Sequence, residues 1–116
     1  MPRNNEEYEE QKCVVQYLEM KHIKFTSIPN STFTSIGARV RNKMSGLRKG
    51  LPDMLMIINK RLVFIEMKKK KGGVVSPEQL EWMSRLNECE SVYCYVCEGF
   101  ESAKEKIDFH LKLLKI

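Results

Sequence analysis

Residues 51–68 read LPDMLMIINKRLVFIEMK, which is two apolar runs joined by a short polar link. The runs cover residues 53–58 and 61–67, and Asn59-Lys60 between them suits a two-residue hairpin turn. Both faces of each run are apolar, as in strands at the centre of a sheet with helices on both sides. The stretch therefore predicts an antiparallel hairpin in the middle of an α/β domain.

The turn also determines which residues face each other across the hairpin. Counting outward from residues 59–60 sets Asp53 opposite Glu66, with side chains about 5 Å apart on one face, and Lys68 follows on that face. Two carboxylates so close repel unless a positive group lies between them. A hard divalent cation with oxygen ligands removes the repulsion. We therefore predict a Mg²⁺ or Mn²⁺ site at Asp53 and Glu66, with the Met67 carbonyl as a candidate third ligand.

Charge is distributed unevenly along the chain. Only two of the fifteen acids, Asp53 and Glu66, lie between residues 20 and 77, where thirteen Lys and Arg occur. Two lone carboxylates in a basic field indicate a metal site that faces a polyanion. The candidate DNA contacts are Arg39, Arg41, Lys43, Arg48, Lys49, Lys69, Lys70 and Lys71. Phosphate contacts of this kind position a duplex without reading its sequence, and solvated loops are the alternative for these residues.

The rest of the sequence predicts a single domain over residues 1–116. We expect helices at 6–21, 76–89 and from residue 100 onward, strands at 25–28 and 92–98, and a long polar loop at 30–50. Ser76 and Gln79 form a capping box, with Pro77 at the first helical position. The predicted order is α-β-β-β-α-β-α, with a small mixed sheet.

The sequence also indicates the cellular location of the protein and the role of its cysteines. No run of eighteen apolar residues and no signal-peptide pattern occurs, so a soluble, intracellular protein with reduced cysteines is expected. Cys94 and Cys97 lie three apart in a predicted strand and should point to opposite faces, which argues against a zinc pair.

Pro52-Asp53 followed by Glu66-Met67-Lys68 resembles the PD-(D/E)xK nuclease signature. More narrowly, the chain is similar to the virus-type replication-repair nuclease domain, VRR-NUC. The resemblance covers residues 5 to about 98, and the segments that carry it are Gly50-Leu51-Pro52-Asp53, Ile65-Glu66-Met67-Lys68 and Ser76-Pro77-Glu78-Gln79, with a looser match at Glu7 and Gln11. It implies a restriction-endonuclease-like core and metal-dependent phosphodiester hydrolysis.

The resemblance also implies roles for the residues of the hairpin. Asp53 and Glu66 would bind the metal, Met67 would contribute its carbonyl, and Lys68 would be catalytic. In chemical terms, Lys68 could orient or deprotonate a metal-bound water, or neutralise charge on the phosphate.

Two helices are expected to add to this site. Glu7 would approach it from the first helix, as a ligand or through water, and Glu10, one helical turn on, is the competing choice. Gln79 would support Lys68 or the attacking water, although the capping box is an adequate structural reason for this residue.

Small stand-alone members of the family resemble Holliday-junction resolvases that act as homodimers. The expected function is therefore a metal-dependent endonuclease for branched DNA in a bacterial cytoplasm, encoded by the bacterium or by a phage. A flap or restriction-type nuclease and a non-catalytic basic nucleic-acid-binding module are the alternatives, and no residue excludes RNA as the substrate.

Overall fold

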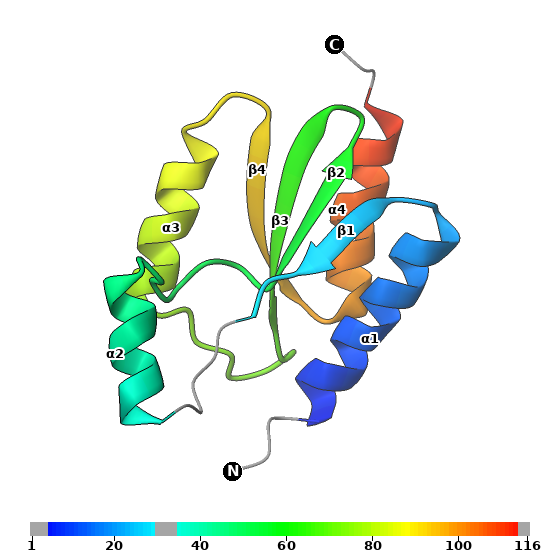
Figure 1. Cartoon of the computed structure of the whole chain (residues 1–116). Coiled ribbons are helices and arrows are strands. Elements are labelled where there is room, and N and C mark those ends of the chain that lie inside the picture. Colours follow the sequence, from blue (N-terminus) through cyan, green and yellow to red (C-terminus); the bar gives the residue numbers. More distant parts are fainter. Residues whose placement is uncertain (1–4, 30–34, 114–116) are drawn as a thin grey trace.

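A computed structural model describes residues 5–29 and 35–113 of the chain as four strands and four helices. The elements are α1 (Asn5–Met20), β1 (Lys24–Ser27), α2 (Ile36–Met44), β2 (Met54–Ile58), β3 (Arg61–Lys68), α3 (Pro77–Asn87), β4 (Val92–Glu98) and α4 (Phe100–Lys112). They form one mixed sheet with helices on both faces (Figure 1). The predicted α/β class is confirmed, and α2 is an addition to the predicted elements. Within the described part of the chain, no helix is long and apolar enough to cross a membrane.

The sheet has the strand order β1-β2-β3-β4, so the predicted hairpin strands lie at its centre. β2 pairs antiparallel with both β1 and β3, whereas β4 runs parallel to β3 after the α3 crossover. The hairpin register is the predicted one, with Ile58 opposite Arg61 and Met54 opposite Ile65. Asn59 and Lys60 both have positive φ, 50° and 67°, as a two-residue turn of this kind requires.

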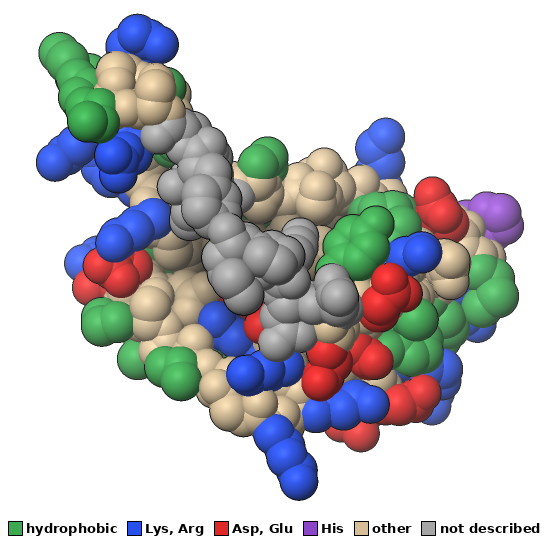
Figure 2. Space-filling model, turned by 90° about the horizontal axis from the view of Figure 1, so that it is seen from below, with side chains coloured by type: hydrophobic (Ala, Val, Ile, Leu, Met, Phe, Trp, Pro, Cys, Tyr) green, Lys and Arg blue, Asp and Glu red, His purple; other side chains and the backbone are tan. Residues whose placement is uncertain are grey.

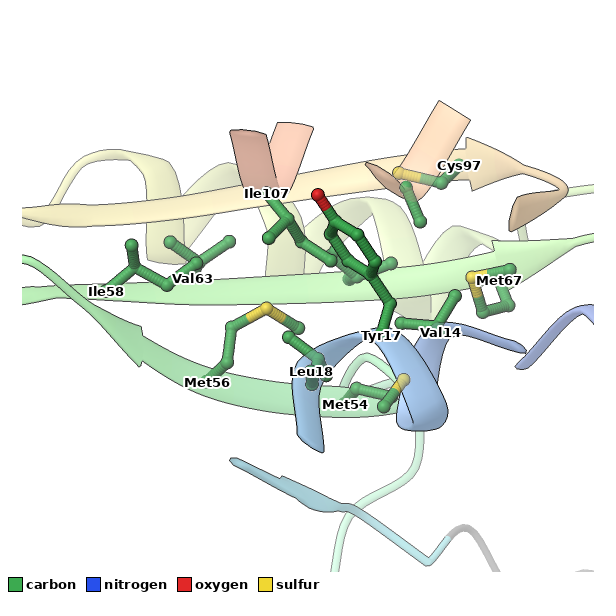
Figure 3. Close-up of a cluster of buried hydrophobic side chains, with 12 residues drawn as sticks. Val14, Tyr17, Leu18, Met54, Met56, Ile58, Val63, Met67, Cys97 and Ile107 are labelled. Atoms are coloured by element: carbon green, nitrogen blue, oxygen red, sulfur yellow. The ribbon is translucent and has the colours of Figure 1, made fainter. Parts of the chain in front are cut away.

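One face of the sheet is sealed by α1 and α4 (Figure 1). Its core contains Val14, Tyr17 and Leu18 from α1, Ile107 from α4, and strand residues that include Met54, Met56, Ile58, Val63, Met67 and Cys97 (Figure 3). Met54 and Met56 are fully buried here, so these methionines belong to the core of the domain. Cys97 lies in this cluster and Cys94 does not, as expected for residues three apart in a strand.

The opposite face is covered only in part. α3 packs against β4 on this side, but none of its side chains is fully buried. Phe64 is buried, whereas Ile57 and Leu62 of the hairpin are 50% and 38% exposed. Helices therefore lie on both faces of the sheet as predicted, but the described residues cover this face less completely at Ile57 and Leu62 than at Phe64. The candidate site lies at the edge of this less protected face.

Helix α2 corrects the prediction of a loop at residues 30–50 for residues 36–44, whereas residues 45–50 are irregular and residues 30–34 lie outside the described part of the chain. Ser35 caps its start, since the Ser35 hydroxyl accepts a hydrogen bond from the Ala38 amide at 3.1 Å. At its end, the Ser45 amide donates to the Arg41 carbonyl at 2.9 Å. Apolar residues recur every four positions at Ile36, Val40 and Met44, but this period is weak among the polar, small and charged residues around them.

Candidate active site

Asp53 lies directly before β2, one position beyond the last paired residues of the hairpin. Its Oδ2 accepts a hydrogen bond from the backbone amide of Met67 at 2.9 Å, so the carboxylate reaches across to the end of β3. The backbone holds Asp53 from the other side, because the Ile28 amide donates to the Asp53 carbonyl at 2.7 Å. The predicted meeting of Asp53 with the Glu66 segment therefore occurs.

Glu66 is the most buried acid of the sheet, at 4% exposure. Its Oε2 accepts a hydrogen bond from Nε2 of Gln79 at 2.7 Å and lies 3.4 Å from Nζ of Lys68. Its Oε1 is buried and has no hydrogen-bond partner among the residues that the structure describes. Such an oxygen is costly to bury without a partner, and it is where a bound cation would be accommodated.

The environment of Glu66 changes its acidity. Burial is the largest cause, followed by repulsion from Asp53, and together they raise the pKa of Glu66 from 4.5 to about 7. Lys68 and Gln79 act in the opposite direction but do not cancel the effect. The charge of Asp53 therefore contributes to the raised pKa of Glu66, as expected for two carboxylates on one face of the sheet. Without a cation, a large fraction of Glu66 is protonated at neutral pH.

Lys68 is held inside the site. Its side chain is only 15% exposed, and its ammonium is directed to Glu66. This matches the prediction that Lys68 projects from the face that carries Glu66. A lysine fixed beside a buried carboxylate can donate a hydrogen bond to a phosphate oxygen or to water in the same space.

Gln79 connects α3 to the carboxylates. The predicted capping box is present, since the Ser76 hydroxyl accepts from the Gln79 amide and Oε1 of Gln79 accepts from the Ser76 amide. Nε2 of the same Gln79 side chain donates to Oε2 of Glu66. The structural and functional interpretations of Gln79 are therefore compatible, and its contact in this structure is Glu66 and not Lys68.

The donor set fits a hard divalent cation. Asp53 and Glu66 supply carboxylate oxygens, the ligands that Mg²⁺ and Mn²⁺ prefer. The Met67 amide donates to Asp53 and therefore points toward it. In an extended strand the amide and the carbonyl of one residue point to the same side, so the Met67 carbonyl, the candidate third ligand, also lies on the side of Asp53. No three His, Cys, Asp or Glu side chains within residues 5–29 and 35–113 form a metal-binding group. The fit therefore depends on the two carboxylates, the carbonyl and water.

The N-terminal acids of α1 hold the segment after Lys68. Oε1 of Glu10 accepts from the Phe100 amide at 2.5 Å, which caps the start of α4, and its Oε2 lies 3.9 Å from Nζ of Lys70. Oε2 of Glu6 accepts from the Lys70 amide at 3.0 Å. Glu10 thus has a structural role that the sequence did not indicate. The assignment of Glu7 to the site stays a prediction.

The basic residues divide into two groups. Arg39, Arg41 and Lys43 lie on α2 and are exposed, and Arg48 and Lys49 follow that helix. Lys49 forms an ion pair with Glu78 at 3.5 Å. Lys69 and Lys70 belong to the segment after Lys68, where Lys70 contacts α1 through both its backbone and its side chain. DNA contact by either group stays a prediction.

Comparison with models of known domain families shows the family of the chain. The model of the VRR-NUC domain matches residues 2–101. The chain belongs to the VRR-NUC domain family. Two solved structures have the same fold: a "VRR_NUC domain protein" has 21% identity and a TM-score of 0.78, and it covers 98% of this chain and 94% of its own. A "VRR_NUC domain" also has 21% identity, with a TM-score of 0.66 over 89% of this chain and 95% of its own. No curated protein matches the chain.

Membership of the VRR-NUC family assigns a nuclease domain of the PD-(D/E)xK type. Nucleases of this family generally depend on a divalent metal. The hairpin carries the two motifs of the signature, with Asp53 before one strand and Glu66 and Lys68 at the end of the next.

Proposed function

We propose that this VRR-NUC domain is a Mg²⁺- or Mn²⁺-dependent endonuclease that hydrolyses phosphodiester bonds in branched DNA such as Holliday junctions. The main support is the buried Glu66 carboxylate, whose Oε1 has no hydrogen-bond partner in the described part of the chain, beside Asp53 on one sheet face. Of this pair, Glu66 is buried, whereas Asp53, directly before β2, is half-buried.

Each protein group has a separate task in this mechanism. Asp53, Glu66 and the Met67 carbonyl hold the cation, which when bound supplies Lewis acidity to a phosphate and to water. Lys68 orients or deprotonates the attacking water, or donates a hydrogen bond that stabilises charge on a phosphate oxygen. Gln79 keeps Glu66 oriented through the 2.7 Å hydrogen bond. Glu7 is the proposed additional acid from α1.

DNA is the proposed substrate because exposed basic residues can contact its phosphates, and branched DNA is proposed on the family resemblance. The exposed side chains of Arg39, Arg41 and Lys43 lie on one helix, α2, and such contacts do not distinguish base sequence. A junction has two equivalent strands to cut, and a two-fold homodimer would present one site to each. We propose this dimer on the family resemblance, and the cytoplasm of a bacterial cell as the place where it acts.

The test is cleavage of a labelled four-way junction beside flap, linear duplex and single-stranded substrates, with Mg²⁺, Mn²⁺ or EDTA. Lys68→Ala should lose about 10²–10⁴-fold in rate, and Lys112→Ala, at the exposed end of α4, is the matched lysine control. Paired symmetric nicks that require metal and Lys68 would support a junction-resolving dimer, and light scattering would give its mass.

Other outcomes would change the proposal in defined ways. Metal-dependent cleavage of flaps or linear DNA alone would keep the site and replace the substrate. Tight, salt-sensitive binding with no product at any metal concentration would replace the enzyme with a binding module. Full activity of Lys68→Ala would remove Lys68 from the mechanism.

A further inference from the structure

Helix α2 projects from the body of the domain. None of its side chains is buried, and Ile36, Val40 and Met44 are 73%, 52% and 84% exposed. In Figure 2, hydrophobic and basic side chains share the lobe that projects at the upper left. A short helix that exposes its large apolar side chains to water contributes little to folding, so these side chains are available to bind a partner.

The apolar side chains form one stripe with basic residues on both sides. Ile36, Val40 and Met44 are spaced by four and therefore lie along one face of the helix, and Leu47, 51% exposed, follows the helix end. Arg39 and Lys43, also four apart, run along one side of this stripe, and Arg41 lies on its other side. No acid occurs between residues 20 and 52. The partner of this surface must therefore be anionic at its margins and apolar at its centre.

The segment that follows α2 is held against α3, the helix that carries Gln79. Nη1 of Arg48 donates to the Lys43 and Leu47 carbonyls, both at 3.0 Å, which closes the end of the helix. Nε1 of Trp82 on α3 donates to the Lys49 carbonyl at 3.1 Å. A Cβ added to Gly50 would lie 2.8 Å from the backbone of Glu78, so this segment touches the start of α3.

That contact links two parts of the molecule. The start of α3 also carries Gln79, which binds Glu66. A ligand bound to α2 would thus be positioned relative to the carboxylates through α3. In Figure 1, α2 stands beside α3, at the end of the sheet from which β3 leads into the loop after Lys68.

We propose that the apolar stripe of α2 inserts at a DNA branch point, where bases are unstacked, while its flanking arginines and lysine bind the phosphates. This inference rests on the proposed nuclease function and adds the element that selects branched over continuous DNA. An intact duplex presents phosphates to the flanks but no apolar surface to Ile36, Val40 and Met44. Open base faces at a branch supply that surface, and aliphatic wedges are a known means of unstacking a base step.

A second copy of the chain fits the same surface poorly. A two-fold contact through the stripe would bring Arg39, Arg41 and Lys43 of one subunit against the same residues of the other, with no acid on either helix. Like charges in such a contact are destabilising. Charge complementarity therefore favours nucleic acid over self-association.

The experiment compares Val40→Thr/Met44→Gln with the wild type and with Met20→Gln. The double variant keeps every charge, and Met20, 63% exposed at the end of α1, is the matched methionine control. Binding to a four-way junction and to a linear duplex is measured by anisotropy in EDTA. A 2-aminopurine base at the branch reports unstacking, and cleavage rates with Mg²⁺ are measured separately.

The double variant should lose about tenfold in junction affinity relative to duplex, together with the 2-aminopurine signal. Duplex binding, melting temperature and salt dependence should stay unchanged. Arg39→Gln should instead weaken binding to both DNAs equally and lower the salt slope.

Several results would overturn the inference. They are equal loss on both DNAs in the double variant, no loss on either, failure of the wild type to bind the junction, or a change of subunit mass, which would make α2 an interface between copies. A wild type that binds and unstacks the junction but cuts nothing would refute the nuclease proposal alone, because the anisotropy and fluorescence measurements need no cleavage.

Discussion

The two faces of the central hairpin are built from alternate residues of the same strands, yet they have opposite physical properties. On the face toward α1 and α4, Met54 and Ile65 are completely buried. On the other face, Ile57 is half exposed, and the buried position nearest the strand end is an acid, Glu66. One face supplies hydrophobic stabilisation, whereas the other keeps a buried carboxyl whose ionisation destabilises the metal-free fold. Strand alternation thus places the folding core on one face of the hairpin and the candidate site on the other.

The largest effect on stability should come from the sealed face. Ile65→Ala removes a fully buried side chain and should cost about 2–5 kcal/mol of unfolding free energy, through lost burial and a cavity. Ile57→Ala, on a neighbouring strand but half exposed, should cost at most about 1 kcal/mol. Urea denaturation of both variants measures the contrast. Equal costs would mean that the second face is covered in solution.

Replacement of Glu66 should stabilise the metal-free protein, whereas most substitutions destabilise a fold. Because burial and Asp53 raise the pKa of Glu66 to about 7, the folded protein binds a proton more tightly than the unfolded chain. The stability linked to this group is complete below about pH 4.5 and is lost as the pH rises through 7, about 3 kcal/mol in all. Glu66→Gln should therefore stabilise the metal-free protein at pH 8 by about 1–3 kcal/mol and abolish cleavage.

The pH dependence and the metal provide the checks. The gain from Glu66→Gln should shrink toward pH 5, where the wild-type carboxyl is already protonated. Mg²⁺ should raise the melting temperature of the wild type at pH 8 and leave the variant unchanged. Glu88→Gln is the control, since Glu88 is exposed after α3. A destabilised Glu66→Gln at pH 8 would contradict the burial argument.

A smaller effect should separate the two roles of Gln79. Ser76→Ala and Gln79→Ala both break the capping box and should each cost about 1 kcal/mol of stability. Only Gln79→Ala also removes the hydrogen bond to Glu66, so only this variant should lose about tenfold in cleavage rate. Denaturation and initial rates at matched temperature distinguish the two. Equal rates for both variants would restrict Gln79 to its structural role.

Local sequence signals were sufficient for the hairpin. Asn59-Lys60 set the turn, the turn set the register, and the register brought Asp53 to the strand that ends in Glu66 and Lys68. The start of α3 was equally readable because Ser76 and Gln79 form a local capping box. Contacts between neighbours in sequence, or between paired strands, follow from short-range rules.

Longer-range features could not be read in this way. The contact of Glu10 with the Phe100 amide joins residues ninety positions apart, and no local pattern marks it. Helix α2 was missed because polar and small residues weaken its apolar spacing, and because it packs too little to be recognised from a buried face. The half-open face was missed since Ile57 and Leu62 look like core residues in the sequence.

The smallest predicted effect distinguishes Glu7 from Glu10, two of the acids of α1. Gln in place of Glu10 can still accept from the Phe100 amide, so Glu10→Gln loses only the charge near the start of α4 and the pairing with Lys70. We expect a cost of about 0.3–1 kcal/mol and little change in cleavage. Glu7→Gln should instead reduce metal-dependent cleavage. The measurement is the Mg²⁺ concentration for half-maximal rate, which should rise for Glu7→Gln alone. A rise for Glu10→Gln with none for Glu7→Gln would make Glu10 the acid that serves the site, and its bond to Phe100 would then have to break when the cation binds.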